Sequence, residues 1–168
     1  MPLYMKWGAG PDIKGEVSET GHLDWLALDS ASFSVGRSTN FQVGSGQEKR
    51  HRDQPTVSDL QLSRTYDAAS PLLFNACVAG VPTNVQIDFL EPAKGADKPP
   101  NVVLSYYLRD CLISSYSVGG GGGGASESLA LNFTGINIEY IPYDADDAPQ
   151  ASKKGMFDLV TAKQSWWK

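Results

Sequence analysis

The chain has 168 residues, of which 41% are hydrophobic and 20% are charged, and its formal net charge is −5. This composition excludes a disordered chain and predicts a single globular domain over residues 1–168. The acidic balance disfavours nucleic-acid binding, because phosphate contacts need a basic face. No segment is apolar over the length of a bilayer span, so no membrane insertion is expected.

The N-terminal third predicts two strands followed by a long polar stretch. Residues 3–7 predict a short first strand, and residues 25–35 change apolar phase midway, which indicates a bent or bulged strand. Residues 36–55 then turn polar and carry the basic run 49–52. Such a length without periodicity predicts an extended loop, because compact domains rarely hold a structureless loop of this size unless it has a function.

Residues 57–66 alternate as a strand, and residues 67–80 have the pattern of the one expected helix. Ser70 is the predicted N-cap, Pro71 suits the first helical position and Gly80 suits the left-handed C-terminal position. The apolar face predicted to pack on the sheet comprises Leu73, Phe74, Cys77 and Val78.

Residues 83–90 give the clearest strand pattern. Val85, Ile87 and Phe89 are predicted to face inward, and Asn84, Gln86 and Asp88 are predicted to face outward.

Two long alternating segments, separated by the glycines 119–124, predict a large β-hairpin over residues 101–140. Most even positions from 102 to 118 are apolar, and a change of phase near residues 134–135 predicts a bulge there. The odd face is weakly charged, which makes it a candidate contact surface: Ser105, Tyr107, Cys111, Ile113, Ser115 and Ser117.

The C-terminal part predicts an acidic loop, an edge strand over residues 156–160 and a flexible tail over 161–168. The whole pattern is that of a mainly β protein, either a β-barrel or two packed antiparallel sheets, with one flanking α-helix.

Reactive groups are few, and no cofactor or metal is expected. The glycine run lacks the Lys-Ser/Thr that follows in a phosphate-binding loop. Cys77 and Cys111 make no metal spacing and are predicted to be buried structural thiols. His22 is expected in a polar turn and His51 in the basic loop, so a hydrolase using either histidine is the weakest hypothesis.

The charged loops leave alternatives open. Asp144, Asp146 and Asp147 lack the pattern of a calcium loop, so a solvated acidic loop is favoured over a cation site. The basic run 49–52 is either a solvated loop or a contact to an acidic protein surface.

Several segments occur in the order that one known family shows them. They are residues 13–16 (IKGE), 21–22 (GH), 66–74 (YDAASPLLF), 112–119 (LISSYSVG) and 127–133 (ESLALNF). Together they resemble the haemolysin-coregulated protein (Hcp) family of bacterial type VI secretion systems.

This resemblance implies a non-catalytic structural protein. Members of the family assemble into homohexameric rings that stack into a tube, meet sheath and spike proteins, and carry effector proteins in the lumen. The resemblance also implies synthesis in the cytoplasm and export without a cleaved signal peptide.

Residue-level hypotheses follow for such an assembly. Arg50 and Arg52 are expected to reach a neighbouring subunit or ring, with Asp144, Asp146 and Asp147 as possible partners. Ser32 and Ser34 are expected to face the lumen and its cargo.

The alternative function is that of a monomeric β-barrel that binds a small ligand or sugar. Its contact residues would be Tyr106, Tyr107 and the aromatic tail.

Overall fold

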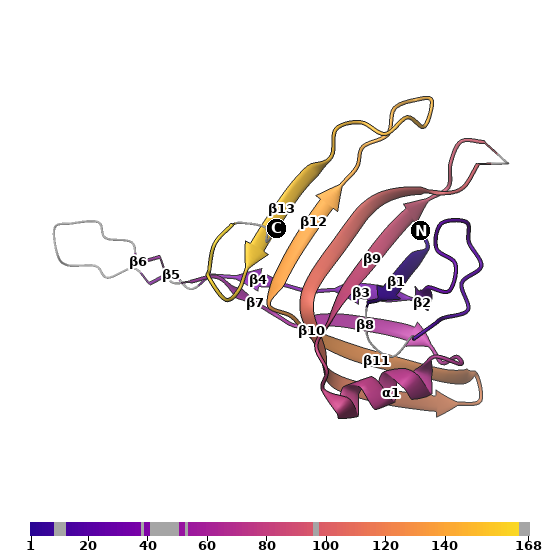
Figure 1. Cartoon of the computed structure of the whole chain (residues 1–168), viewed down its shortest axis with the longest axis horizontal. Coiled ribbons are helices and arrows are strands. Elements are labelled where there is room, and N and C mark those ends of the chain that lie inside the picture. Colours follow the sequence, from indigo (N-terminus) through magenta and orange to yellow (C-terminus); the bar gives the residue numbers. More distant parts are fainter. Residues whose placement is uncertain (9–12, 38, 41–50, 53, 96–97, 165–168) are drawn as a thin grey trace.

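The computed structural model describes residues 1–8, 13–37, 39–40, 51–52, 54–95 and 98–164. These residues form thirteen antiparallel β-strands and one α-helix (Figure 1). The strands are β1 (Leu3–Trp7), β2 (Leu26–Leu28), β3 (Ser30–Ser32), β4 (Val35–Gly36), β5 (Thr39–Asn40), β6 (His51–Arg52), β7 (Thr56–Val57), β8 (Leu60–Thr65), β9 (Thr83–Glu91), β10 (Asn101–Gly121), β11 (Gly124–Asn132), β12 (Gly135–Tyr140) and β13 (Lys153–Asp158), and the helix is α1 (Ser70–Ala79).

The long strand β10 belongs to both sheets of the molecule. Its first half pairs with β9 and β12, and its second half pairs with β11. One sheet therefore runs β2-β1-β9-β10-β12-β13 and the other runs β10-β11-β8-β3. Among the described strands the ladders end at β2, β3 and β13, so they do not close into a barrel. The mainly β prediction is confirmed in its form of two packed sheets.

The predicted side-chain phase of β10 is wrong in the middle of the strand. Its register shifts between Leu108 and Cys111, and again between Ile113 and Ser115. Asp110 takes a positive φ of 48° within the first shift, as a bulge residue does. Because each shift exchanges the two faces, Cys111 and Ile113 are buried in the core instead of lying on a contact surface.

The phase change near residues 134–135 has a different cause from the predicted bulge. β11 pairs with β8 in one sheet, whereas β12 pairs with β10 and β13 in the other. The chain leaves the first sheet after Asn132 and enters the second at Gly135, so the two segments have separate inward faces.

The C-terminal end of α1 is confirmed, and its N-cap is corrected. Gly80 has a φ of 62°, and its N–H donates to the carbonyl of Ala76. At the other end Ala69 occupies the N-cap position without a side-chain cap, because the Ser70 hydroxyl donates to Glu127 Oε1 at 3.0 Å instead.

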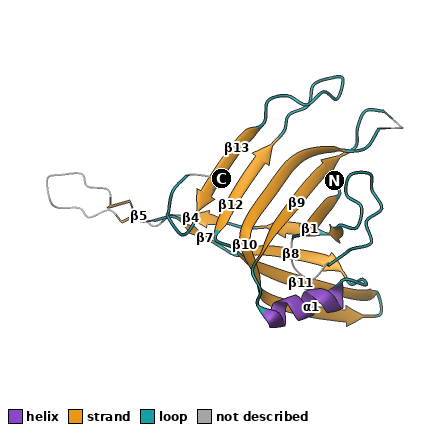
Figure 2. Cartoon of the chain, in the orientation of Figure 1, coloured by secondary structure: helices purple, strands orange, loops and turns teal. Residues whose placement is uncertain are grey.

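The buried face of α1 also differs from the predicted one. Ser70, Leu73 and the half-buried Cys77, at i, i+3 and i+7, share the buried face, and the Cys77 thiol donates to the carbonyl of Ile113 in β10. Figure 2 shows α1 lying against the sheet that contains β10 and β11. Phe74 and Val78 remain 53% and 72% exposed. The hydrogen bond from Ser70 to Glu127 fixes this rotation of the helix and turns the two apolar side chains outward.

Two short strand pairs, within and next to the described part of the polar stretch 36–55, form a projecting arm. β4 pairs with β7, and β5 pairs with β6. In Figure 1 these short pairs extend away from the two sheets along the longest axis of the molecule. Where the structure describes it, the predicted loop is therefore an arm built from two short strand pairs.

Two glycine features shape the turns. β10 runs to Gly121 and β11 begins at Gly124, so the glycine run is a tight hairpin end and not a long loop. At Gly15 a Cβ would lie 2.1 Å from the carbonyl oxygen of Trp25, which explains why this position of the 13–16 segment is glycine. Within the described residues, α1 is too short to cross a membrane.

Candidate functional site

The most buried charges among the described residues join the two sheet strands β8 and β11 to the helix. Arg64 Nη1 donates to Glu127 Oε1 at 2.7 Å, and both residues are 1% exposed. Arg64 Nη2 donates to Asp67, and Arg64 Nε donates to the carbonyl of Ala27 at 3.2 Å. The guanidinium thus has carboxylate partners on two sides, which offsets the cost of burying it.

The Glu127 carboxylate also accepts hydrogen bonds from two hydroxyl groups. Ser70, at the start of α1, and Tyr116, in β10, both donate to its carboxylate. Burial and the neighbouring Glu127 carboxylate raise the pKa of the Tyr116 hydroxyl, so the hydroxyl keeps its proton. These bonds hold the N-terminus of α1 against the hairpin of β10 and β11.

A second buried polar cluster contains His22. Its Nε2 lies 3.0 Å from Asp88 Oδ2, and Asp88 Oδ1 accepts the Ser105 hydroxyl at 2.7 Å. Tyr4 and Trp25 contact the imidazole ring. His22 occupies the predicted turn, but its ring is buried, and Asp88 is buried where the alternation predicts an outward side chain.

This cluster has the residue types of a hydrolase without the required contact. The serine hydroxyl donates to the carboxylate, and the imidazole Nε2 also points to that carboxylate. A nucleophile needs its base within hydrogen-bond distance. The cluster of His22, Asp88 and Ser105 therefore joins the turn before β2 to strands β9 and β10.

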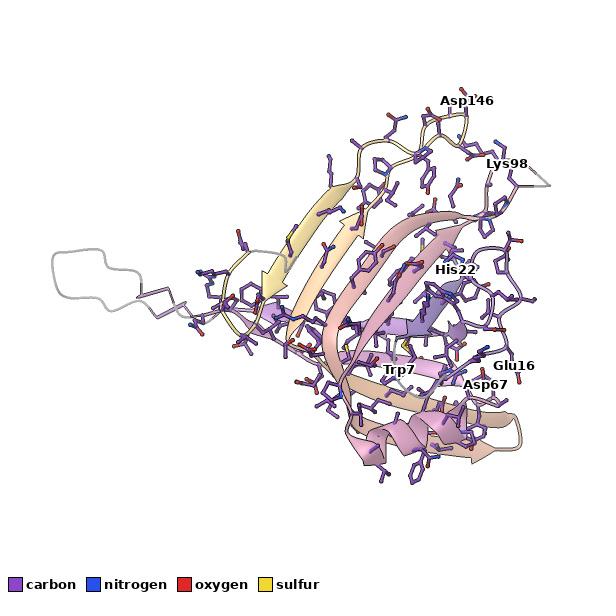
Figure 3. All side chains as sticks on the ribbon, in the orientation of Figure 1. Trp7, Glu16, His22, Asp67, Lys98 and Asp146 are labelled. Atoms are coloured by element: carbon purple, nitrogen blue, oxygen red, sulfur yellow. The ribbon has the colours of Figure 1, made fainter. Side chains whose placement is uncertain are left out.

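An open pocket of about 520 Å³ lies beside Arg64. The segment 16–20 forms one wall and residues 64–67 form the other, with Glu16 and Asp67 on the same side of the molecule in Figure 3. Its lining contains one cationic side chain, Arg64, and four carboxylates: Glu16, Glu19, Asp29 and Asp67.

The predicted acidic loop is held by its own carboxylates. Asp144 accepts the N–H groups of Asp146 and Ala148, both at 2.9 Å, and these bonds lower the pKa of its carboxyl. Asp147 accepts the N–H of Lys94 at 2.8 Å and the side chain of Asn101 at 3.1 Å. Asp147 therefore fastens the loop to residues 94–101 beside it.

The contact predicted from the sequence is one between copies, and its described members lie on different parts of the chain. Arg50 lies outside the described residues, and the backbone of Arg52 lies in β6 on the arm. The loop containing Asp146 lies elsewhere, at the top of Figure 3. Ser32 ends β3 and Ser34 follows it, and both are exposed.

The remaining candidate residues lie in the core or at its edge. Cys77 and Cys111 are free thiols, half-buried and buried respectively, and burial raises the pKa of Cys111 to about 12. Tyr106 packs edge-on against Phe33 and Phe89, so its ring is part of the core edge. In the described part of the chain, no group of three or more potential metal ligands is present.

A family model described as "Type VI secretion system effector, Hcp" matches residues 4–140. The chain belongs to the Hcp family. It is 27% identical over 148 residues to Protein hcp1 of Pseudomonas aeruginosa, which covers 87% of this chain and 86% of that protein. The resemblance seen in the sequence is thus confirmed, and the chain is a type VI secretion system tube protein by family.

Solved structures support the same fold. The crystal structure of Hcp1 from Salmonella typhimurium has a TM-score of 0.73 at 20% identity and covers 98% of each chain. A structure of a type six secretion system protein has a TM-score of 0.78 at 21% identity and covers 98% of this chain and 99% of that one. The Hcp description names a secretion-system protein and no catalytic class.

Sequence reasoning missed the Arg64–Glu127 pair although a signal was present. Arg64 shares the inward phase of Leu60 and Leu62 in β8, and Glu127 shares the phase of Leu129 and Leu131 in β11. A charge at an inward strand position predicts a buried partner of opposite sign. Asp88 gives no such signal, because its strand position alternates as an outward one.

Proposed function

We propose that this chain forms hexameric rings that stack into the inner tube of the type VI secretion system. The observation that carries the proposal is the Hcp family match over residues 4–140. The rings meet sheath and spike proteins, and the tube is exported with effector proteins in its lumen. The chain is made in the cytoplasm and leaves it without a cleaved signal peptide.

Exposed apolar side chains on and after α1 support an assembling protein. Phe74, Val78 and Val81 are each more than half exposed, and Leu72 is 40% exposed. Their concentration within residues 72–81 is typical of a surface that another protein covers.

The ends of the two sheets support association as well. β13 pairs with β12 alone among the described strands, and β3 pairs with β8 alone. Each of these edge strands presents backbone groups on one side for a neighbouring subunit. Because the two edges differ in sequence, a contact between them is heterologous, which is the kind that closes into a ring.

The arm is the proposed contact between neighbouring subunits or rings. Arg50 and Arg52 would meet an acidic surface there, with Asp144, Asp146 and Asp147 as one candidate acceptor. Ser32 and Ser34 are proposed to line the lumen, where small polar side chains contact cargo without gripping it.

Imaging of the purified protein tests the assembly directly. Negative-stain microscopy with size-exclusion chromatography is expected to show rings of about six subunits. A monomer at high concentration, with no rings visible, would contradict the proposal and favour the ligand-binding alternative.

The arm is tested by charge reversal. Arg50→Glu with Arg52→Glu is expected to shorten tubes while the circular dichroism spectrum and melting temperature stay as in the parent. Lys6→Glu with Lys163→Glu is the matched control, because it reverses two cations outside the arm. Tubes of unchanged length in the arm variant would remove the arm from the stacking contact.

A further inference from the structure

The open pocket beside Arg64 has the charge of a cation-binding surface. Glu16 and Asp29 are exposed at its rim, and Glu19 is half-buried in its wall. The Arg64 guanidinium beneath is already bonded to Glu127 and Asp67. Negative charge therefore exceeds positive charge in the hollow, where low-dielectric walls concentrate the field.

The buried network gives this pocket a fixed shape. Arg64 belongs to β8 and is held by β11 through Glu127, while Asp67 also accepts the N–H of Ala69 at 2.9 Å. One wall is thus anchored to the sheet and to the start of α1. The other wall is fixed where the N–H of Gly15 donates to the carbonyl of Asp24 at 2.9 Å and that of Val17 donates to the carbonyl of Trp25 at 3.2 Å.

The chain itself carries a segment of the complementary charge. Residues 49–52 read Lys-Arg-His-Arg, and their described part, His51–Arg52, is strand β6 of the arm. In Figure 1 this strand lies at one end of the longest axis. Glu16 and Asp67, which mark the pocket, lie toward the other end in Figure 3. The arm of a given copy therefore points away from its own pocket.

Complementary surfaces at opposite ends of one subunit favour a head-to-tail contact. The arm of one copy meets the pocket of the next, and the pattern repeats from subunit to subunit. Carboxylates bind guanidinium groups through strong charge-assisted hydrogen bonds, which suits arginine in such a contact.

We propose that the acidic pocket between residues 16–20 and 64–67 receives the basic arm segment 49–52 of a second copy of this chain. This inference rests on the proposed assembly and names the surface that the arm contacts. The loop at residues 144–147 is the weaker acceptor. Asp144 and Asp147 are occupied by bonds within and beside that loop, which leaves Asp146 as its exposed carboxylate.

Single charge reversals on the full chain test the acceptor. Glu16→Lys and Asp29→Lys are each expected to weaken association between copies by about tenfold, measured by sedimentation velocity at low salt. Asp146→Lys is the matched control, because it changes the charge by the same amount at an exposed carboxylate outside the pocket. It is expected to change association by less than about twofold.

A charge swap distinguishes the loss of the contact between copies from the loss of the folded structure. Arg52→Glu alone weakens association, and its combination with Glu16→Lys is expected to restore association toward the parent value. Added salt should weaken the parent contact and remove the difference between parent and variant, because exposed charges are screened.

The outcomes separate the pocket from the assembly itself. A parent protein that forms no rings contradicts the proposed function. Rings in the parent with unchanged association in Glu16→Lys and Asp29→Lys overturn the pocket proposal alone. A loss confined to Asp146→Lys assigns the contact to the 144–147 loop, and a charge swap that fails to restore association also overturns the pocket.

Discussion

Arg64 and Glu127 lie in the interior, whereas Asp144 and Asp146 lie on an exposed loop, and the two pairs use charge in different ways. The interior pair joins β8 to β11 and receives Ser70 from the helix and Tyr116 from β10. Asp144 accepts backbone N–H groups within its own turn. Charge in the interior fixes how distant elements pack, and charge on the loop fixes local backbone.

The difference explains why a tube protein tolerates an acidic surface. Removing an interior charge leaves its partner without compensation in a medium of low polarity, whereas water replaces the partner of an exposed charge. The interior charges are therefore tied to the fold, whereas an exposed charge such as that of Asp146 can be changed without leaving a buried partner uncompensated.

Glu127→Gln gives the largest expected effect on stability. The free energy of unfolding should fall by about 3 kcal/mol, because Arg64 loses its buried carboxylate and Asp67 compensates in part. Urea unfolding monitored by tryptophan fluorescence measures this loss.

Glu139→Gln is its matched control. Glu139 pairs with the half-exposed Lys154 at 3.2 Å, so its loss should be about 1 kcal/mol or less. Equal losses in the two variants would contradict the distinction between a fully buried ion pair and a partly exposed one.

Asp88→Ala is expected to have a smaller effect than Glu127→Gln. It leaves His22, Ser105 and the half-buried Gln86 without their acceptor, which should lower the free energy of unfolding by about 2 kcal/mol. The same urea unfolding experiment measures the change.

Asp59→Ala is the comparison for this cluster. Asp59 accepts Ser114 at 2.6 Å and Asn132 at 2.7 Å near the surface, where water takes its place, so the loss should be about 1 kcal/mol. A larger loss at Asp59 than at Asp88 would show that burial does not set the size of the effect.

The fold was predictable where a single face decides the pattern. The bounds of Leu3–Trp7 and Thr83–Glu91 follow from alternation, apart from the buried Asp88, and the end of α1 follows from the left-handed Gly80 at its C-cap. β10 was not predictable in the same way, because it changes sheets along its length. The register shifts in the middle of the strand, at 108–111 and 113–115, exchange inward and outward faces, and alternation alone does not locate such shifts.

The sequence predicts the charge of the candidate contact residues but not where these residues lie in the fold. The basic run 49–52 is plain in the sequence, but the choice of the proposed acceptor depends on which carboxylates are already bonded within the chain. Asp147 reads as free from the sequence and is bonded to Lys94 and Asn101 in the structure. Glu16 and Asp29 lie far from Asp67 in sequence and line one pocket through the pairing of distant strands.

The smallest expected effect is local and concerns Asp144 in the exposed acidic loop. The N–H groups of Ala148 and Asp146 lower the pKa of Asp144 from its ordinary value of 3.8. A carboxyl with a lowered folded pKa stabilises the loop above its unfolded pKa and loses this contribution as the pH falls through the folded value.

Amide exchange measured between about pH 5 and about pH 2 should therefore show faster opening of the Asp146 and Ala148 amides at the acid end, after correction for intrinsic rates. The Asp144→Asn variant keeps an acceptor oxygen without a titrating proton, so its opening should not depend on pH in this range. Acid opening that persists in this variant would assign the loop's stability to Asp147 and its ion pair with Lys98 at 3.7 Å. Asp147, which bonds the loop to residues 94–101, would then be the residue that orders it.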